Sequence, residues 1–325
     1  MLTQILFFVI ISAGSLLGII REECSYERVL PVTCISYIFL LYLFGLFNRL
    51  ELGFYIILII NGLAYLSFVV YSVRYIREKS FSTLFAKLRR TVFTPSMIVF
   101  SLCFILLTYA DYGYRVANWD ELSHWALTVK QMTFYNVLGN SRQADIVVYK
   151  SYPPAMAIFQ YLLQKIYLLT FNAPETVVSE WRLYFAYQTL SLAVVMPFTA
   201  KLDYKKVHTY FLWIVLFLSF IFVFDFAYTT IYIDPILGCL SGTSLSAVFF
   251  LRGKRLQNGE DTYDILDKAY ILLCIFLLVL TKDAGMLPAV FASLAYIYIY
   301  IYRVVGMLQT EHGCCRFSPL SVRPC

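Results

Sequence analysis

Long apolar blocks separated by short polar connections fill most of the chain, and one longer polar stretch interrupts them at residues 111–154. Most of the blocks reach the roughly 20 residues that a helix needs to cross about 30 Å of hydrocarbon. The pattern therefore predicts an all-α, polytopic helical membrane protein. About nine spanning helices are expected, at Leu2–Ile20, Val29–Phe47, Leu52–Ser72, Val92–Ala110, Arg182–Ala200, His208–Phe226, Pro235–Leu251, Ala269–Thr281 and Met286–Tyr302.

The composition agrees with this class of protein. The chain has 325 residues, of which 60% are hydrophobic and only 14% are charged, and the surface of a soluble domain of this length needs more charge. The net charge of +6 does not indicate nucleic-acid binding, because the basic residues cluster in loops between apolar blocks, as membrane topology requires. The sequence has no phosphate-binding glycine loop and no zinc-ligand spacing, which argues against nucleotide-dependent chemistry.

The basic residues also predict the orientation. The loop between the third and fourth expected helices is rich in lysine and arginine and has one acid, so it is expected in the cytoplasm and residues 111–154 outside. Residues 155–171 either span the membrane or lie along its outer surface. Gln160, Gln164 and Lys165 form a polar stripe at helical spacing there, and a surface position keeps the later basic loops inside. We therefore expect an interfacial (jacket) helix.

The outer stretch is expected to contain two such helices, at about 119–134 and 155–171. Asn118, followed at the third helical position by Glu121, resembles a capping box. The chain then divides into four regions: an N-terminal membrane region of four helices (1–110), the outer loop (111–171), a C-terminal membrane region of about five helices (172–303) and a short polar tail (304–325). The tail is either a lipid-modified or disordered end, or the remnant of a truncated reading frame.

Acidic residues at a bilayer boundary are costly to keep without a function. Asp120 and Glu121 begin the first outer helix, and Asp234 lies in the short outer loop before the seventh expected span. A carboxylate there can accept a proton from a hydroxyl, or bind a divalent metal that neutralises phosphate. The structural alternatives are that Glu121 caps its helix and that the two aspartates interact with helix N-termini. The topology predicts that Asp120 and Asp234 converge over one outer cleft.

Basic and aromatic residues accompany these acids. His124 follows on the same helical face and can hold a phosphate, relay a proton or ligate a metal, or only pack at the interface. Lys150 and Tyr152 precede two prolines, and Lys150 either binds a lipid phosphate or extends toward headgroups. Lys282, at a break between the last two helices, is open to both interpretations. Arg115 is a further cation near the acids.

Two short motifs carry a resemblance to a known family. Asn118-Trp-Asp-Glu-Leu-Ser-His-Trp125, followed by Lys150-Ser-Tyr-Pro-Pro154 and a second outer acid, resembles the GT-C superfamily of integral-membrane glycosyltransferases. The first string looks more particularly like uncharacterised bacterial membrane proteins of this type. The resemblance covers roughly residues 92–302. Three helices precede the acidic loop here, where many relatives have one.

This resemblance implies an enzyme that moves a hexosyl or pentosyl group from an outward-facing polyprenyl-phosphate donor to a hydroxyl of a glycan, lipid or protein. It implies Asp120 as the general base or a metal ligand, with Glu121 beside it, and Asp234 as the second acid. A divalent metal, Mg or Mn, would be held by the two aspartates. The donor phosphate would be held by Lys150, Lys282 and His124. The expected location is a bacterial plasma membrane, with the active face outward in the cell envelope.

Three other functions remain open at this point. A transporter or flippase for a lipid-linked or anionic substrate would place ionisable residues near mid-membrane on broken helices, whereas these acids lie at the outer edge. A polysaccharide polymerase or ligase would also use lipid-linked glycans outside. A non-catalytic membrane scaffold would use the outer loop only to bind a partner.

Overall fold

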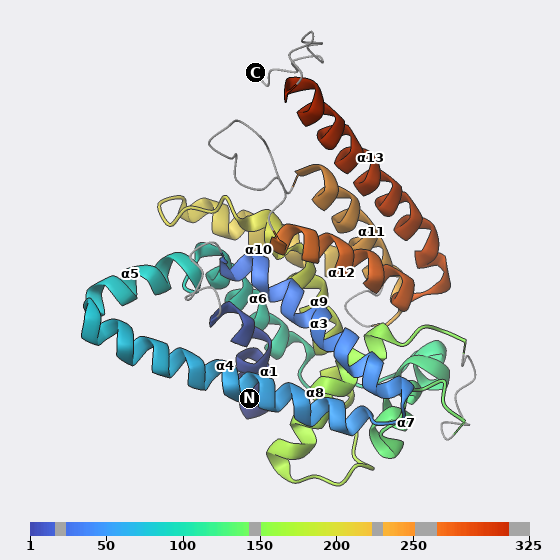
Figure 1. Cartoon of the computed structure of the whole chain (residues 1–325). Helices are drawn as coiled ribbons and strands as arrows, with labels where there is room; N and C mark the ends of the chain where they lie inside the picture. Colours follow the sequence, from blue (N-terminus) through green and yellow to red (C-terminus); the bar gives the residue numbers. More distant parts are fainter. Residues whose placement is uncertain (17–23, 143–150, 223–229, 251–264, 312–325) are drawn as a thin grey trace.

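The structure is a computed structural model of the chain and describes residues 1–16, 24–142, 151–222, 230–250 and 265–311. All regular structure within these residues is helical (Figure 1). Twelve α-helices lie in the described part: α1 (Leu2–Ser12), α3 (Tyr26–Leu46), α4 (Leu50–Glu78), α5 (Phe81–Thr91), α6 (Pro95–Asp111), α7 (Ala126–Tyr135), α8 (Ala155–Phe171), α9 (Glu180–Val195), α10 (Val207–Phe222), α11 (Ile233–Phe250), α12 (Ile265–Thr281) and α13 (Met286–Glu311). Shorter turns are η1 (Ala13–Leu16), the π-helical η2 (Glu121–Trp125), η3 (Met196–Thr199) and η4 (Asp283–Gly285).

Three helical segments of the described chain are long and apolar enough to cross a membrane, namely α3, α4 and the segment Asp283–Ile301 that contains most of α13. The pair α5 and α6 gives a fourth if two helices bent by 64° count as one span. The other expected spans coincide with shorter helices, such as α9 with 16 residues and α12 with 17. Nine spans therefore remain a prediction.

The helix ends that the topology predicts on the inner side meet one another. Arg28 at the start of α3 forms an ion pair with Asp267 at the start of α12, with Nη2 and Oδ1 2.9 Å apart. The Thr94 hydroxyl donates to Glu27 Oε2 at 3.0 Å. The Ser96 hydroxyl, in the first turn of α6, donates to the carbonyl of Thr199 at 3.1 Å. This arrangement is the one that alternating spans require, because helix ends on one side of a bilayer lie at one end of the bundle.

Helix α8 differs from the expected interfacial helix, because it lies inside the protein. It packs between α9, α7, α1 and α3, in the lower middle of Figure 1. Its polar stripe is buried and faces protein partners: Gln160 Nε2 donates to the carbonyl of Leu183 at 3.1 Å, and Gln164 Nε2 to that of Val177 at 2.8 Å. Polar side chains at helical spacing can form their hydrogen bonds with buried protein groups as well as with water.

The ion pairs at the end of α8 keep this helix near the predicted outer side. The Lys165 ammonium is only 6% exposed and lies 2.8 Å from Glu175 Oε1 and 3.0 Å from Glu51 Oε1. Glu51 follows the expected outer turn between α3 and α4. The C-terminal half of α8 therefore contacts segments predicted to be outside.

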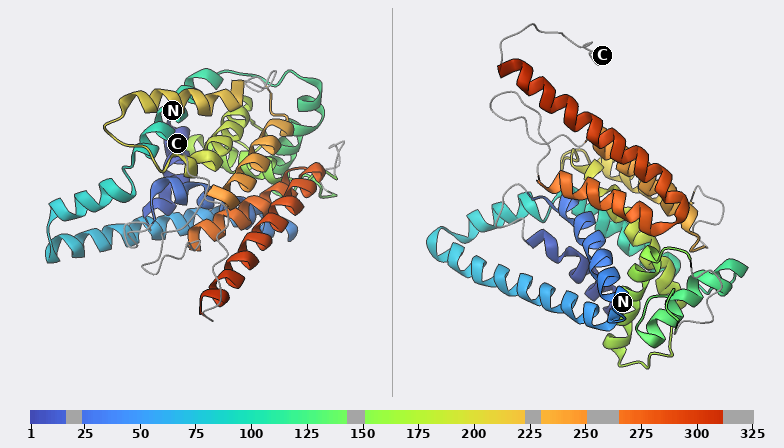
Figure 2. Two further views of the ribbon diagram at one scale, coloured as in Figure 1. Left: turned by 90° about the horizontal axis from the view of Figure 1, so that it is seen from above. Right: turned by 45° about the vertical axis from the view of Figure 1, so that its right-hand side comes forward.

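Helix α5 occupies a segment that the distribution of basic residues predicts to be a loop. The Ser80 hydroxyl caps it by accepting from the backbone N–H of Thr83, and the Thr94 hydroxyl and Pro95 begin α6 directly afterwards. Helices α4 and α5 project together from the bundle in Figure 2, away from α13. The apolar side of α5 is anchored by Leu84, which is buried.

Candidate functional site

The site is a pocket of about 140 Å³ formed by four segments that are distant in sequence. A pocket of this volume has room for on the order of ten groups the size of a water molecule. That is enough for one sugar ring or one phosphate. The segment that precedes α8 and contains Pro153 and Pro154, called the proline-led segment below, contributes Tyr152. The turn between α12 and α13 contributes Lys282. The lining residues are Asp120, His124, Trp125, Tyr152, Tyr232, Ile233, Asp234 and Lys282. The structure thus brings Asp120 and Asp234 to one pocket.

Asp234 and Lys282 form an ion pair at the rim of this pocket. Lys282 Nζ lies 2.6 Å from Asp234 Oδ1, and the two side chains are 26% and 68% exposed. Lys282 is aimed across by the sharp turn η4 between α12 and α13. Gly285 closes this turn, and a Cβ atom there would collide with the backbone carbonyl of Leu278. The glycine is required because the turn packs directly onto α12.

Asp120 lies at the N-cap of a widened helical turn. It precedes the π-helical η2, in which the N–H of Ala126 bonds to the carbonyl of Glu121. Single π-helical turns of this kind often occur at functional sites, because they re-aim side chains. The Asp120 side chain is exposed and makes no capping hydrogen bond with its own helix, so its carboxylate faces the pocket opening.

Glu121 has the opposite environment and does not line the pocket. It is fully buried, and both carboxylate oxygens accept hydrogen bonds. Oε1 accepts from the backbone N–H of Ile231 at 2.8 Å, and Oε2 accepts from the Tyr184 hydroxyl at 2.9 Å. Oε2 also accepts from the N–H groups of Ala117 and Asn118 at 3.4 and 3.3 Å, the Asn118 contact being the one expected of a capping box.

These four contacts define a positioning role. Glu121 joins the segment before η2 to α9 and to the residues that lead into α11. Asp120 precedes Glu121 directly, and Asp234 lies three residues after Ile231, so Glu121 links the two segments that carry the aspartates. Both oxygens of its carboxylate accept hydrogen bonds from protein groups, and the side chain does not line the pocket.

His124 packs in an aromatic cluster between the pocket and the protein interior. Its ring lies edge-on to Trp125 and Tyr152, with centroid distances of 4.4 and 5.1 Å, and the rings of Trp125 and Tyr152 stack 5.5 Å apart. Burial lowers the pKa of His124 to about 4, although Asp120 acts in the opposite direction. The imidazole is therefore neutral at pH 7, which favours its packing role over a charged contact with phosphate.

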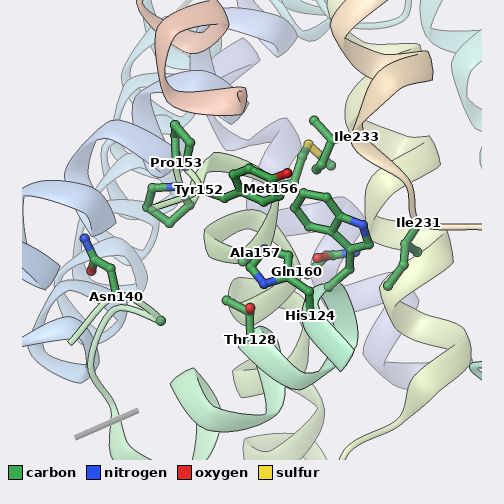
Figure 3. Close-up of a pocket in the computed structure, with 13 residues that line it drawn as sticks. His124, Thr128, Asn140, Tyr152, Pro153, Met156, Ala157, Gln160, Ile231 and Ile233 are labelled. Atoms are coloured by element: carbon green, nitrogen blue, oxygen red, sulfur yellow. The ribbon is translucent and has the colours of Figure 1, made fainter. Parts of the chain in front are cut away.

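A second, inner cavity lies beneath this cluster. It holds about 20 Å³, which is room for about one water molecule. Figure 3 shows that His124, Tyr152 and Gln160 gather around it from η2, the proline-led segment and α8. It is too small for a sugar ring, whereas the outer pocket has room for one.

The buried neutral histidine predicts a pH-dependent stability. Unfolding restores a pKa near 6.5, so the unfolded state binds more protons than the folded state between about pH 4 and 6.5. Stability from this residue is therefore full above about pH 6.5 and lost as the pH falls, by about 2 kcal/mol from pH 7 to 5. Because other groups also titrate over this range, the His124 contribution is measured as a difference between proteins: in thermal unfolding, the stability of the wild type relative to His124→Gln should fall by this amount from pH 7 to 5. The stability of the wild type relative to His208→Gln, at an exposed histidine, should not change with pH in this way.

The remaining predicted residues are placed as follows. Tyr152 lines the pocket. Lys150 lies outside the described residues. Arg115 is exposed and does not line the pocket. Two residues of the site were not predicted from the sequence. Tyr232 lines the pocket, and its position two residues before Asp234 was a usable signal. Tyr184 donates to Glu121, a contact that no local pattern indicated.

The fold and site define an all-helical protein with apolar helices long enough to cross a membrane and an acidic pocket at one end of the bundle. No protein-family model matches the chain, and no curated protein or solved structure does.

Proposed function

We propose that this protein is an integral-membrane glycosyltransferase of the multi-pass type. It moves a sugar from an outward-facing polyprenyl-phosphate donor to a hydroxyl of a glycan, lipid or protein, in the bacterial plasma membrane. The observation that carries the proposal is the meeting of Asp120, Asp234 and Lys282 in one pocket, at an end of a bundle of apolar helices. A base and a cation in one pocket are the groups that transfer from a lipid phosphate needs.

In the proposed reaction, the Asp120 carboxylate accepts the proton of the acceptor hydroxyl. The acceptor oxygen forms a bond with the anomeric carbon of the sugar. The bond between that carbon and the phosphate oxygen breaks, and its electron pair stays on the lipid phosphate. The Lys282 ammonium stabilises the negative charge that develops on the leaving oxygen. Asp234 positions Lys282 before the donor binds.

The side chains available as metal ligands do not favour the divalent metal that was expected as an optional cofactor. Within the described residues, no group of three or more histidine, cysteine, aspartate or glutamate side chains is placed to hold a metal. Asp234, one of the two expected ligands, already contacts the Lys282 ammonium at 2.6 Å. We therefore assign the cationic role to Lys282.

Purified protein incubated with a panel of polyprenyl-phosphate-linked labelled sugars and a membrane extract of acceptors tests the proposal. The expected result is movement of the label from the donor to an acceptor. The same protein in liposomes with the labelled lipid in one leaflet tests the main alternative, a flippase. Movement of the lipid across the bilayer without transfer of its sugar would overturn the proposed function.

Lys282→Met is expected to lower transfer by about 10²–10³-fold, because it removes the cation that stabilises the leaving phosphate. Thermal stability should change little, since an exposed ion pair contributes less than about 1 kcal/mol. Lys130→Met, at an exposed lysine of α7 that does not line the pocket, is the matched control. Equal transfer by the two variants would remove Lys282 from the mechanism.

A further inference from the structure

Two basic segments that are far apart in the sequence lie together at the end of the bundle predicted to be inside. They are residues 74–94, which contain α5, and residues 201–206, which precede α10. The Arg89 guanidinium lies over the Tyr204 ring, 4.9 Å from its centroid, and the Tyr204 hydroxyl donates to the carbonyl of Phe93. The two segments, called the basic surface below, contain nine lysine and arginine residues and only two acids. The net charge of the chain, +6, is therefore concentrated on this surface.

Helix α5 has an apolar side that the rest of the protein covers only in part. Leu84 is buried in a small cluster with Phe68 and Tyr71 of α4. Phe81 and Phe85, which lie one helical turn apart on the same side of α5, are 66% and 53% exposed. Two exposed phenylalanines within a strongly cationic surface form a patch that is both apolar and positive. The partner that matches such a patch is both apolar and negative.

The direction and depth of α5 indicate where this patch lies relative to the bilayer. The sequence predicts that α6 crosses the membrane, and α5 is bent by 64° from α6, so α5 lies closer to the membrane plane than to its normal. With 11 residues α5 is too short to cross a bilayer. It packs on Phe68 and Tyr71, which lie in the last turns of the span expected at Leu52–Ser72. These contacts place α5 at the depth of the lipid headgroups, at the left edge of the bundle in Figure 1.

We propose that the basic surface binds anionic phospholipids of the inner leaflet, with α5 lying in the plane of their headgroups. Phe81 and Phe85 enter the boundary between headgroups and acyl chains, as the apolar side of an interfacial helix does. Arg89 follows Phe85 by one turn on the same side, is exposed, and forms no ion pair with an acid among the described residues. Its guanidinium can donate two parallel N–H groups to a lipid phosphate.

Charge complementarity and depth together select this partner. An acidic soluble protein would match the cations, but the depth of α5 places Phe81 and Phe85 against lipid and not against water. A zwitterionic lipid would match the aromatic rings, but it would leave the excess of positive charge unbalanced. The inference rests on the membrane embedding and orientation in the proposed function and not on the transfer reaction.

The lipid preference can be measured with Phe85→Trp in vesicles, by the quenching of the added tryptophan relative to the wild type. Phosphatidylglycerol with brominated acyl chains is compared with brominated phosphatidylcholine at the same mole fraction. We expect phosphatidylglycerol to associate with this position about 5–30-fold more strongly. Ala86→Trp is the control for position, because the next residue of a helix is turned by about 100° and this one points away from the apolar side. It should be quenched less by both lipids.

Three variants in the Phe85→Trp protein test the role of charge. Arg89→Gln should lower the preference for phosphatidylglycerol about fivefold, the usual contribution of one basic residue near an anionic membrane surface. Arg89→Lys keeps the charge and should retain most of the preference, which a merely structural role of the arginine would not predict. Arg49→Gln, at an exposed arginine at the opposite end of α4, is the matched control and should leave the preference unchanged.

The preference of the Phe85→Trp protein should also fall in 1 M salt, because the screening length shrinks from about 10 Å at 0.1 M to about 3 Å. Equal quenching by the two brominated lipids would overturn the inference, as would quenching by neither or equal effects of Arg89→Gln and Arg49→Gln. None of these measurements involves sugar transfer, so a failure here is distinct from a failure of the proposed function.

Discussion

Replacing Asp120 by asparagine is expected to lower sugar transfer by about 10²–10⁴-fold, the usual contribution of a positioned general base. Asparagine keeps the size of the side chain and cannot accept the proton of the acceptor hydroxyl. Because Asp120 is exposed and caps nothing, the variant should fold with unchanged thermal stability. Transfer from a labelled polyprenyl-phosphate sugar measures the effect, and binding of the donor should be retained.

Asp283→Asn is the matched control for this variant. Asp283 is exposed and adjacent in sequence to Lys282, yet it does not line the pocket. It should transfer sugar at the wild-type rate. If Asp120→Asn is as active as this control, Asp120 has no part in the mechanism.

Replacing Glu121 by glutamine is expected to destabilise the protein by about 3 kcal/mol, although the two side chains have the same shape. Every partner of Glu121 is a donor: the backbone N–H groups of Ala117, Asn118 and Ile231, and the Tyr184 hydroxyl. An amide places its own NH₂ against one of these groups, which leaves buried donors unpaired. Thermal unfolding in detergent measures the loss.

Two further variants separate this network from a general effect of charge. Tyr184→Phe removes one of the donors to Glu121 and should cost about 1 kcal/mol. Glu78→Gln, at an exposed glutamate of α4, should cost nothing measurable. If Glu121→Gln is as stable as the wild type, the buried network does not fix the segments that carry the two aspartates. Activity should fall together with stability, since those segments would shift.

Much of the fold follows from the sequence. Each of the nine apolar blocks overlaps a described helix, and α13 begins at Met286 as expected. This succeeds because a long apolar run forms a helix wherever its backbone groups must pair internally. The basic loop at 74–90 was less informative, because a high density of lysine and arginine hides the apolar side of α5, on which Leu84 lies.

The sequence predicted the acidic residues of the candidate site but not the residues that contact them. Asp120 and Asp234 follow from topology, since both come from segments expected on the outer side. Whether they act in catalysis stays a prediction. The pairing of Lys282 with Asp234 and the burial of Glu121 depend on how distant segments meet, and no spacing in the sequence encodes that.

The sequence by itself determined an all-helical, strongly apolar protein with one acidic segment where two aspartates can meet. Only the tertiary structure decided that α8 is an interior helix and that Glu121 is buried and accepts hydrogen bonds from three separate segments. The physical reason is the same in each case. Local periodicity records which side chains share a helix face, whereas packing between segments far apart in sequence decides whether that face meets protein, lipid or a ligand.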